Sequence, residues 1–210
     1  MHESSLAALR TARSELILGG QKSGKSRRAE LLARDWLAAM PQHRAVLIAT
    51  AQPWDDEMRA RIARHQADRA QRVPGMTTVE EPLALAEAIA QHSHGDVLVV
   101  VDCLTLWLTN LLMPACAEEF DKKVPLAQVE PSLLAALLIA IEGARGPVVL
   151  VGNEIGLGVI PLGAEVRAFV DALGQLNQAV ARVCARVTLM AAGLPLTLKD
   201  VQEPTKDDCR

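Results

Sequence analysis

The segment 19–26, GGQKSGKS, has the spacing of a phosphate-binding loop. It matches G-x-x-x-x-G-K-[ST] directly after an apolar run and at the start of a helical pattern, which is the context the motif requires. Glycines let backbone N–H groups close around phosphate oxygens, the lysine reaches the β- and γ-phosphates, and the hydroxyl ligates Mg²⁺. The sequence therefore predicts a nucleoside triphosphate site in which Lys25 is catalytic and Ser26 binds the metal. The residues of this loop are Gly19, Gly20, Gln21, Lys22, Ser23, Gly24, Lys25 and Ser26.

An acidic residue, Asp102, ends the most apolar run of the chain, DVLVVVD. An acid after a strand is often only structural, but P-loop enzymes hold their Mg²⁺ with an aspartate in this position. Paired with the upstream loop, Asp102 is predicted to be the second metal ligand. Glu154, in GNEIGLG, is a weaker candidate because its neighbouring glycines could simply mark a turn.

A histidine, His65, lies in the stretch RIARHQADR. A helix would place Arg61, His65 and Arg69 on one face, since they are four residues apart. The arginines would oppose protonation of the imidazole, which leaves it nucleophilic near neutral pH. Phosphoryl transfer alone needs no histidine nucleophile. From the residues alone, a solvated helix face and a covalent role both remain open.

The composition narrows the class of protein. The chain has 210 residues, half of them hydrophobic, and a net charge of −3, which leaves no basic footprint for nucleic acid. Its first residues are polar and no apolar run reaches about 18 residues, so neither a signal peptide nor a membrane span is expected. A cytoplasmic protein is therefore the expectation, and its cysteines are predicted to be reduced because they lie far apart. They are Cys103, Cys116, Cys184 and Cys209.

Short apolar runs alternate with longer helical patterns along the chain. Strands are predicted at 15–20, 45–50, 96–102, 147–152, 186–193 and 194–199. Helices are predicted at 25–40, 55–70, 82–91, 104–113, 131–143 and 164–184.

This alternation indicates an α/β fold of the P-loop NTPase (RecA-like) type. We expect a mostly parallel sheet flanked by helices, with a short antiparallel strand at the C-terminus. The expected organisation is an N-terminal arm (1–14) and one catalytic domain (15–210), in which 114–130 is a connection. Ligands bind beyond the carboxyl ends of such strands, where the P-loop, Thr50, Asp102 and the segment 152–154 should meet.

Several ordered motifs together resemble one family. They are LILGGQKSGKSRRAE, LIATAQPWDDEMRARIARHQADR, TTVEEP, VLVVVDCLTLWLTNLL, VVLVGNEIGLGVIP and FVDALGQLNQAVA. The first is generic to P-loop proteins, whereas the block that ends at His65 and the N-E-x-G-x-G block are specific. Over residues 15 to 199 the chain resembles the bifunctional adenosylcobinamide kinase/adenosylcobinamide-phosphate guanylyltransferases of cobalamin biosynthesis.

The resemblance implies a role for each matching position. His65 would attack the α-phosphate of GTP and carry the guanylyl group, and Arg61 and Arg69 would help to neutralise phosphate charge. Neither reading of Arg167, Asn177 and Gln178, as ligand contacts or as packing, is favoured. Further GTP contacts would fall on Ala49, Thr50, Ala51, Gln66, Ala67, Asp68, Arg69, Glu80 and Asp102.

The implied activity has two steps, both with Mg²⁺. ATP or GTP phosphorylates adenosylcobinamide, and GMP from GTP is then transferred to adenosylcobinamide phosphate, giving adenosyl-GDP-cobinamide and pyrophosphate. The resemblance also implies a homo-oligomer, for which we expect a trimer. Two alternatives are a plain small-molecule kinase with His65 on its surface, and a nucleotide-binding regulatory or assembly protein without turnover. The residues do not indicate the preferred phosphate donor, the corrinoid-binding residues or whether both activities are retained.

Overall fold

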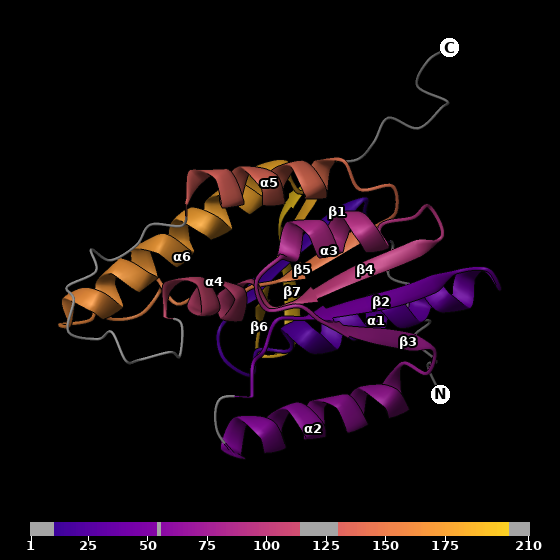
Figure 1. The fold of residues 1–210 in the computed structure, drawn as a ribbon, viewed down its shortest axis with the longest axis horizontal. Coiled ribbons are helices and arrows are strands. Elements are labelled where there is room, and N and C mark those ends of the chain that lie inside the picture. The colour runs from indigo at the N-terminus through magenta and orange to yellow at the C-terminus, as the bar shows by residue number, and fades with distance from the viewer. Residues whose placement is uncertain (1–10, 54–55, 114–129, 202–210) are drawn as a thin grey trace, which may run out of the picture.

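A seven-stranded sheet forms the centre of the protein in the computed structural model. The structure describes residues 11–53, 56–113 and 130–201, except for the side chains of residues 57 and 61. The strand order is β3-β2-β4-β5-β1-β6-β7. The first six of these are parallel and β7 is antiparallel to β6 (Figure 1). The strands are β1 (Ser14–Gly19), β2 (Arg44–Ala49), β3 (Met76–Glu80), β4 (Val97–Asp102), β5 (Val148–Val151), β6 (Arg186–Ala191) and β7 (Leu194–Asp200).

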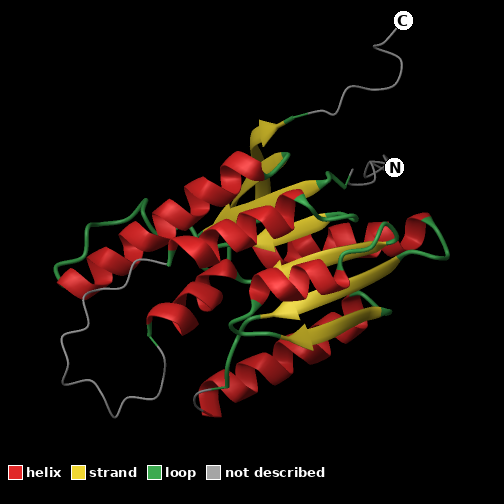
Figure 2. Cartoon of the chain, turned by 45° about the horizontal axis from the view of Figure 1, so that its top comes forward, coloured by secondary structure: helices red, strands yellow, loops and turns green. Residues whose placement is uncertain are grey.

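The helices cover the two faces of the sheet and one of its edges. Helix α1 packs on one face, in an apolar cluster with Ile17 and Val149, whereas α3, α4, α5 and α6 share a second cluster with Leu16 and Leu150 on the other face. Helix α2 lies beyond β3, at the edge of the sheet (Figures 1 and 2). The helices are α1 (Lys25–Ala39), α2 (Asp56–Arg72), α3 (Leu85–His92), α4 (Leu104–Leu112), α5 (Pro131–Glu142) and α6 (Ala164–Val183).

This architecture confirms the predicted fold class. Strand β5 lies between the P-loop strand β1 and the Asp102 strand β4. Runs such as LILG in β1 and VLVVVD in β4 are buried on both faces, which explains why they are continuously apolar rather than alternating. Among the described residues, no helix is long and apolar enough to cross a bilayer.

One strand was missed, and one helix begins three residues later than predicted. Strand β3 was not expected, because the largely exposed residues MTTVE lack the alternation that marks a strand, and parallel pairing with β2 holds them extended. Helix α3 begins at Leu85 instead of residue 82, because the Glu81 carboxylate accepts the N–H groups of Leu83 and Ala84 and holds 82–84 in a turn.

The N-terminal boundary also differs slightly from the expected arm of 1–14. Strand β1 begins at Ser14, and the Arg13 carbonyl accepts the Val148 N–H at 3.0 Å. The guanidinium of Arg13 donates to the Glu142 carbonyl at 2.6 Å. Residues 1–10, and nearly all of the expected connection at 114–130, lie outside the described residues.

Candidate active site

The P-loop is shaped by two glycines with positive φ. Gly19 has a φ of 152°, and a Cβ there would lie 2.5 Å from the Met190 carbonyl oxygen and 2.6 Å from the Ser23 hydroxyl. Gly24 has a φ of 101° and would place a Cβ 3.2 Å from the Gly193 Cα. The Gly193 N–H donates to the Ser23 carbonyl at 3.0 Å. The turn between β6 and β7 therefore supports the loop from below, at distances that only glycine permits.

The side chain of Lys25 points back into this loop. Its ammonium group is buried and donates to the Gly20 carbonyl at 2.6 Å. Burial lowers the pKa of Lys25 from its ordinary value, and the nearby Cys103 and Asp102 side chains partly offset that effect. A buried cation needs counter-charge, and a phosphate group in the loop would supply it.

The ends of β2 and β4 meet beside the P-loop. The Thr50 N–H donates to the Asp102 carbonyl at 3.2 Å, and the Thr50 carbonyl accepts the Asn110 amide at 2.8 Å. Thr50 is fully buried, and its hydroxyl forms two hydrogen bonds with the backbone of Cys103. Its hydroxyl therefore positions the strand ends, while half-buried Asp102 keeps its carboxylate near Lys25.

The donor set at this point fits a magnesium ion held partly by nucleotide. Mg²⁺ prefers oxygen ligands, and in nucleotide enzymes one or two carboxylates and substrate phosphates supply them. Ser26 and Asp102 offer a hydroxyl and a carboxylate beside the phosphate loop. Among the described residues, no group of three or more His, Cys, Asp or Glu side chains could hold a metal by itself. Any ion here would therefore need phosphate oxygens to complete its coordination.

Helix α2 brings a second set of candidate residues to the edge of the sheet. The Gln66 amide donates to the Glu80 carboxylate at 3.3 Å, and Arg69 donates to the Thr78 hydroxyl at 3.5 Å. Burial lowers the pKa of Arg69, while the carboxylates of Asp102 and Glu30 favour its charged form. This face of α2 is thus turned toward β3 and toward the carboxylate of Asp102.

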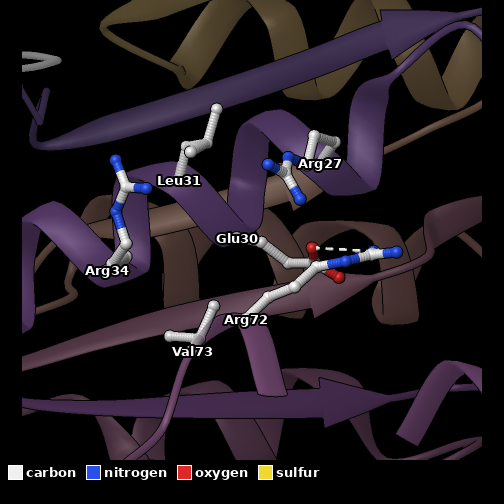
Figure 3. A pocket seen from close by; sticks show the side chains of 6 residues that line it. All are labelled: Arg27, Glu30, Leu31, Arg34, Arg72 and Val73. Carbon is white, nitrogen blue, oxygen red and sulfur yellow. Dashed lines mark hydrogen bonds and ion pairs between the residues drawn. The ribbon is translucent and has the colours of Figure 1, made fainter. Parts of the chain in front are cut away.

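The last turn of α2 is tied to α1. Arg72 forms ion pairs with Glu30 of α1 at 3.3 Å and with Asp68 of its own helix at 3.2 Å. Figure 3 shows Arg72 and Glu30 facing each other across a small pocket lined also by Arg27. With a volume of about 80 Å³, that pocket has room for a few waters and not for a nucleotide.

His65 lies on α2 with an exposed side chain. Within the part of the chain that the structure describes, no hydrogen bond joins its ring to the P-loop. Exposed Ala67 lies further along the same helix, and Ala49 and Ala51 flank Thr50 at the end of β2. The Ala49 carbonyl accepts the Glu81 N–H at 3.0 Å.

The segment after β5 also reaches the P-loop. The Glu154 N–H donates to the Gly19 carbonyl at 3.0 Å, and the Glu154 carboxylate accepts the Gly156 N–H at 2.7 Å. The Glu154 side chain therefore stabilises its own turn. Buried Asn177 donates to the Asn153 carbonyl at 3.0 Å and so holds the start of this segment against α6.

Three residues that position the site were not singled out from the sequence. Asn110 of α4 holds the carbonyls of Thr50 and Pro82, at 2.8 and 3.1 Å. Thr105 accepts the Asn153 N–H at 2.9 Å. Cys103 completes the contact with Thr50. The sequence offered one signal for Asn110, which is an amide residue inside the apolar helix LTLWLTNLL. A buried amide needs hydrogen-bond partners, so it indicates contacts with neighbouring segments.

Comparisons with known proteins match nearly the whole chain. Residues 15–198 match the family model described as cobinamide kinase / cobinamide phosphate guanyltransferase. The bifunctional adenosylcobalamin biosynthesis protein CobP of Pseudomonas aeruginosa is 45% identical over 185 residues, which cover 88% of this chain and 96% of that protein. The proteins named CobU of Escherichia coli and Salmonella typhimurium are 33% and 34% identical over 187 residues, covering 88% of this chain and 98% of each relative.

Proposed function

This chain belongs to the cobinamide kinase / cobinamide phosphate guanyltransferase family, and we propose that its two reactions share one phosphate site, with His65 serving only the second. The observation that carries the proposal is the meeting of buried Lys25 with Asp102 at the end of β4, opposite the face of α2 that bears Arg69. Both reactions break a phosphate anhydride, so both need the same stabilisation of negative charge.

In the first reaction, a hydroxyl oxygen of adenosylcobinamide attacks the γ-phosphorus of ATP or GTP. A new P–O bond forms, the bond from the γ-phosphorus to the β–γ bridging oxygen breaks, and the nucleoside diphosphate leaves as the hydroxyl loses its proton. The backbone N–H groups of the P-loop and the Lys25 ammonium hold the β- and γ-phosphates. A Mg²⁺ ion held by Ser26 and Asp102 would supply further charge neutralisation.

In the second reaction, a neutral ring nitrogen of His65 attacks the α-phosphorus of GTP. An N–P bond forms, the bond from the α-phosphorus to the α–β bridging oxygen breaks, and pyrophosphate leaves. The phosphate of adenosylcobinamide phosphate then attacks the same phosphorus, the N–P bond breaks, and GMP is transferred. The guanidinium of Arg69, four residues along the helix, would offset charge on the transferred group.

A labelling experiment without corrinoid tests the histidine. The protein is incubated with Mg²⁺ and GTP labelled with ³²P at the α-phosphate, then denatured, for the wild type, His65→Ala and His94→Ala. His94 is exposed, in the turn before β4, and serves as the matched control. We expect acid-labile label on the wild type and on His94→Ala, and none on His65→Ala.

The alternatives predict other results. A plain kinase would phosphorylate adenosylcobinamide while the wild type stays unlabelled, and this outcome would refute the role of His65. A nucleotide-binding protein without turnover would bind GTP and transfer nothing in either assay.

A further inference from the structure

An open groove lies between α6 and the loop that precedes it. Its volume is about 890 Å³, near the upper end of the range for small-molecule sites. One wall is the segment 154–161, the other is a face of α6, and Leu18 of β1 and Val187 of β6 also line it. Figures 1 and 2 show α6 projecting beyond the sheet, with the preceding loop running along its N-terminal half.

The lining combines apolar walls with amide and charged groups at the margins. Leu157, Val159 and Ile160 of the loop are 81%, 96% and 76% exposed, which is unusual for large apolar side chains that lie together. From α6, the exposed amides of Gln175 and Gln178 enter the groove one turn apart. Such a lining suits a flat, apolar ligand whose edges carry hydrogen-bonding groups.

The loop wall is anchored at both ends. Near its start, the Glu154 N–H is bound to the Gly19 carbonyl of the P-loop. Near its end, Arg167 of α6 donates to the carbonyls of Pro161 and Leu162. The groove is therefore bounded by elements that hydrogen bonds hold in place, and it begins beside the phosphate loop.

The groove and the proposed nucleotide contacts lie on opposite sides of the P-loop strand. In the sheet order, β2 and β3 are on one side of β1, and β6 and β7 are on the other. Glu80 is the last residue of β3, and Gln66 of α2 donates to it. The groove is lined from β1, β6 and β7. A nucleotide that extends from the P-loop toward β3 would leave the groove free for a second substrate.

From this arrangement we propose that the groove binds the acceptor, with the corrin macrocycle of cobinamide between the loop 154–161 and α6. This inference rests on the proposed function, since it assigns the second substrate of the same site. A corrin carries methyl groups and carboxamide side chains around its periphery, and these match the apolar lining and the amides of Gln175 and Gln178. The aminopropanol arm would extend past Glu154 to the phosphate held by the P-loop.

Gly174 offers a way to fill the groove. It lies on the lining face of α6, and a Cβ at this position meets no atom within 4 Å. A phenylalanine there would project into the groove and fill part of it, whereas an alanine would leave most of it open. Gly174→Phe and Gly174→Ala are therefore the test variant and its matched control.

The experiment measures steady-state phosphorylation of adenosylcobinamide, the binding of adenosylcobinamide by equilibrium dialysis without nucleotide, and labelling by α-³²P-GTP without corrinoid. For Gly174→Phe we expect the KM and the dissociation constant for adenosylcobinamide to rise at least about tenfold. The KM for ATP and the labelling of His65 should stay at wild-type values, and Gly174→Ala should resemble the wild type throughout. Gln178→Phe, on the exposed face one turn away, is a second blocking variant if the first folds poorly.

Two outcomes would overturn the inference, and a third would contradict only the role of His65. Wild-type KM and dissociation constant for adenosylcobinamide in both folded blocking variants would show that the acceptor binds elsewhere. If the variants instead change the sedimentation coefficient and leave acceptor binding intact, the groove is a contact between copies of this chain. Unlabelled wild-type protein that still binds adenosylcobinamide would contradict the role of His65 and leave the groove assignment standing.

Discussion

The hydroxyl of Thr50 joins the end of β2 to the residue after β4 by two hydrogen bonds. It accepts the Cys103 N–H at 2.8 Å and donates to the Cys103 carbonyl at 2.7 Å. Because Asp102 directly precedes Cys103, this contact sets the position of the proposed metal ligand relative to β2.

Replacing Thr50 with valine should therefore destabilise the protein. The side chain keeps its shape, but the buried Cys103 N–H loses its acceptor and the Cys103 carbonyl keeps only the Trp107 N–H, which costs about 1–3 kcal/mol. Urea unfolding measures the change, and Thr50→Ser should stay near the wild type. Thr77→Val is the control, because the Thr77 hydroxyl makes only a long contact of 3.4 Å at the sheet edge. An equal loss in both valine variants would contradict the assigned role.

Removing the Lys25 ammonium should impair both reactions. We expect Lys25→Ala to lower kcat for phosphorylation and the rate of guanylylation by roughly 100-fold or more, as for other groups that stabilise developing charge. Arg27→Ala, which removes an exposed cation two residues along α1, should change either rate by less than about threefold. A loss confined to one reaction would show that the two do not share this phosphate site.

The two neighbouring glycines at the start of the P-loop should respond differently to alanine. In Gly19→Ala the new methyl meets a backbone oxygen at 2.5 Å and the backbone has a φ of 152°, so we expect a loss of about 2–4 kcal/mol. In Gly20→Ala the Cβ meets no atom within 4 Å, and the melting temperature should stay near the wild-type value. Calorimetry of both variants tests whether the turn after β6 supports the loop.

A buried ion pair connects β1 to α1. Glu15 lies 2.7 Å from Arg28, accepts the Thr188 hydroxyl at 2.8 Å, and has Arg186 at 3.8 Å. Removing Glu15 leaves Arg28 buried without its counter-ion, so Glu15→Ala should cost about 3–5 kcal/mol.

Arg28→Ala should cost less than Glu15→Ala, because Glu15 retains Thr188 and Arg186. Chemical denaturation of the two variants gives the order directly. The reverse order would mean that Arg186 contributes little to holding the Glu15 charge.

Alkaline pH should weaken the fold through two buried thiols. Burial raises the pKa of Cys103 to about 11 and that of Cys184 to about 12, from an ordinary value of 9.0. Between pH 9 and these raised pKa values, the unfolded chain loses the thiol protons while the folded chain keeps them. The free energy of unfolding therefore falls as pH rises above 9. Urea unfolding from pH 8 to 10.5 should show this decline, and Cys184→Ala should reduce it. A decline that is unchanged in this variant would exclude the Cys184 thiol as a source.

Much of the fold could be predicted because its signals are local. The buried strands β1 and β4 are apolar runs, and the helices between them have the expected spacing. Strand β3 could not be predicted, since its exposed residues owe their conformation to pairing with β2 rather than to their own pattern.

The candidate site divides in the same way. The sequence by itself was enough to identify the family, and it predicted the phosphate loop, the acid that ends β4 and the role of His65, because each is a short motif whose spacing carries its meaning. Only the tertiary structure decided which of these residues meet. Thr50 bonds to Cys103, Glu15 accepts a hydrogen bond from Thr188, which is 173 residues away in the chain, and β1, β6 and α6 enclose a groove. The order of the parallel strands brings these segments together, and no local pattern relates them.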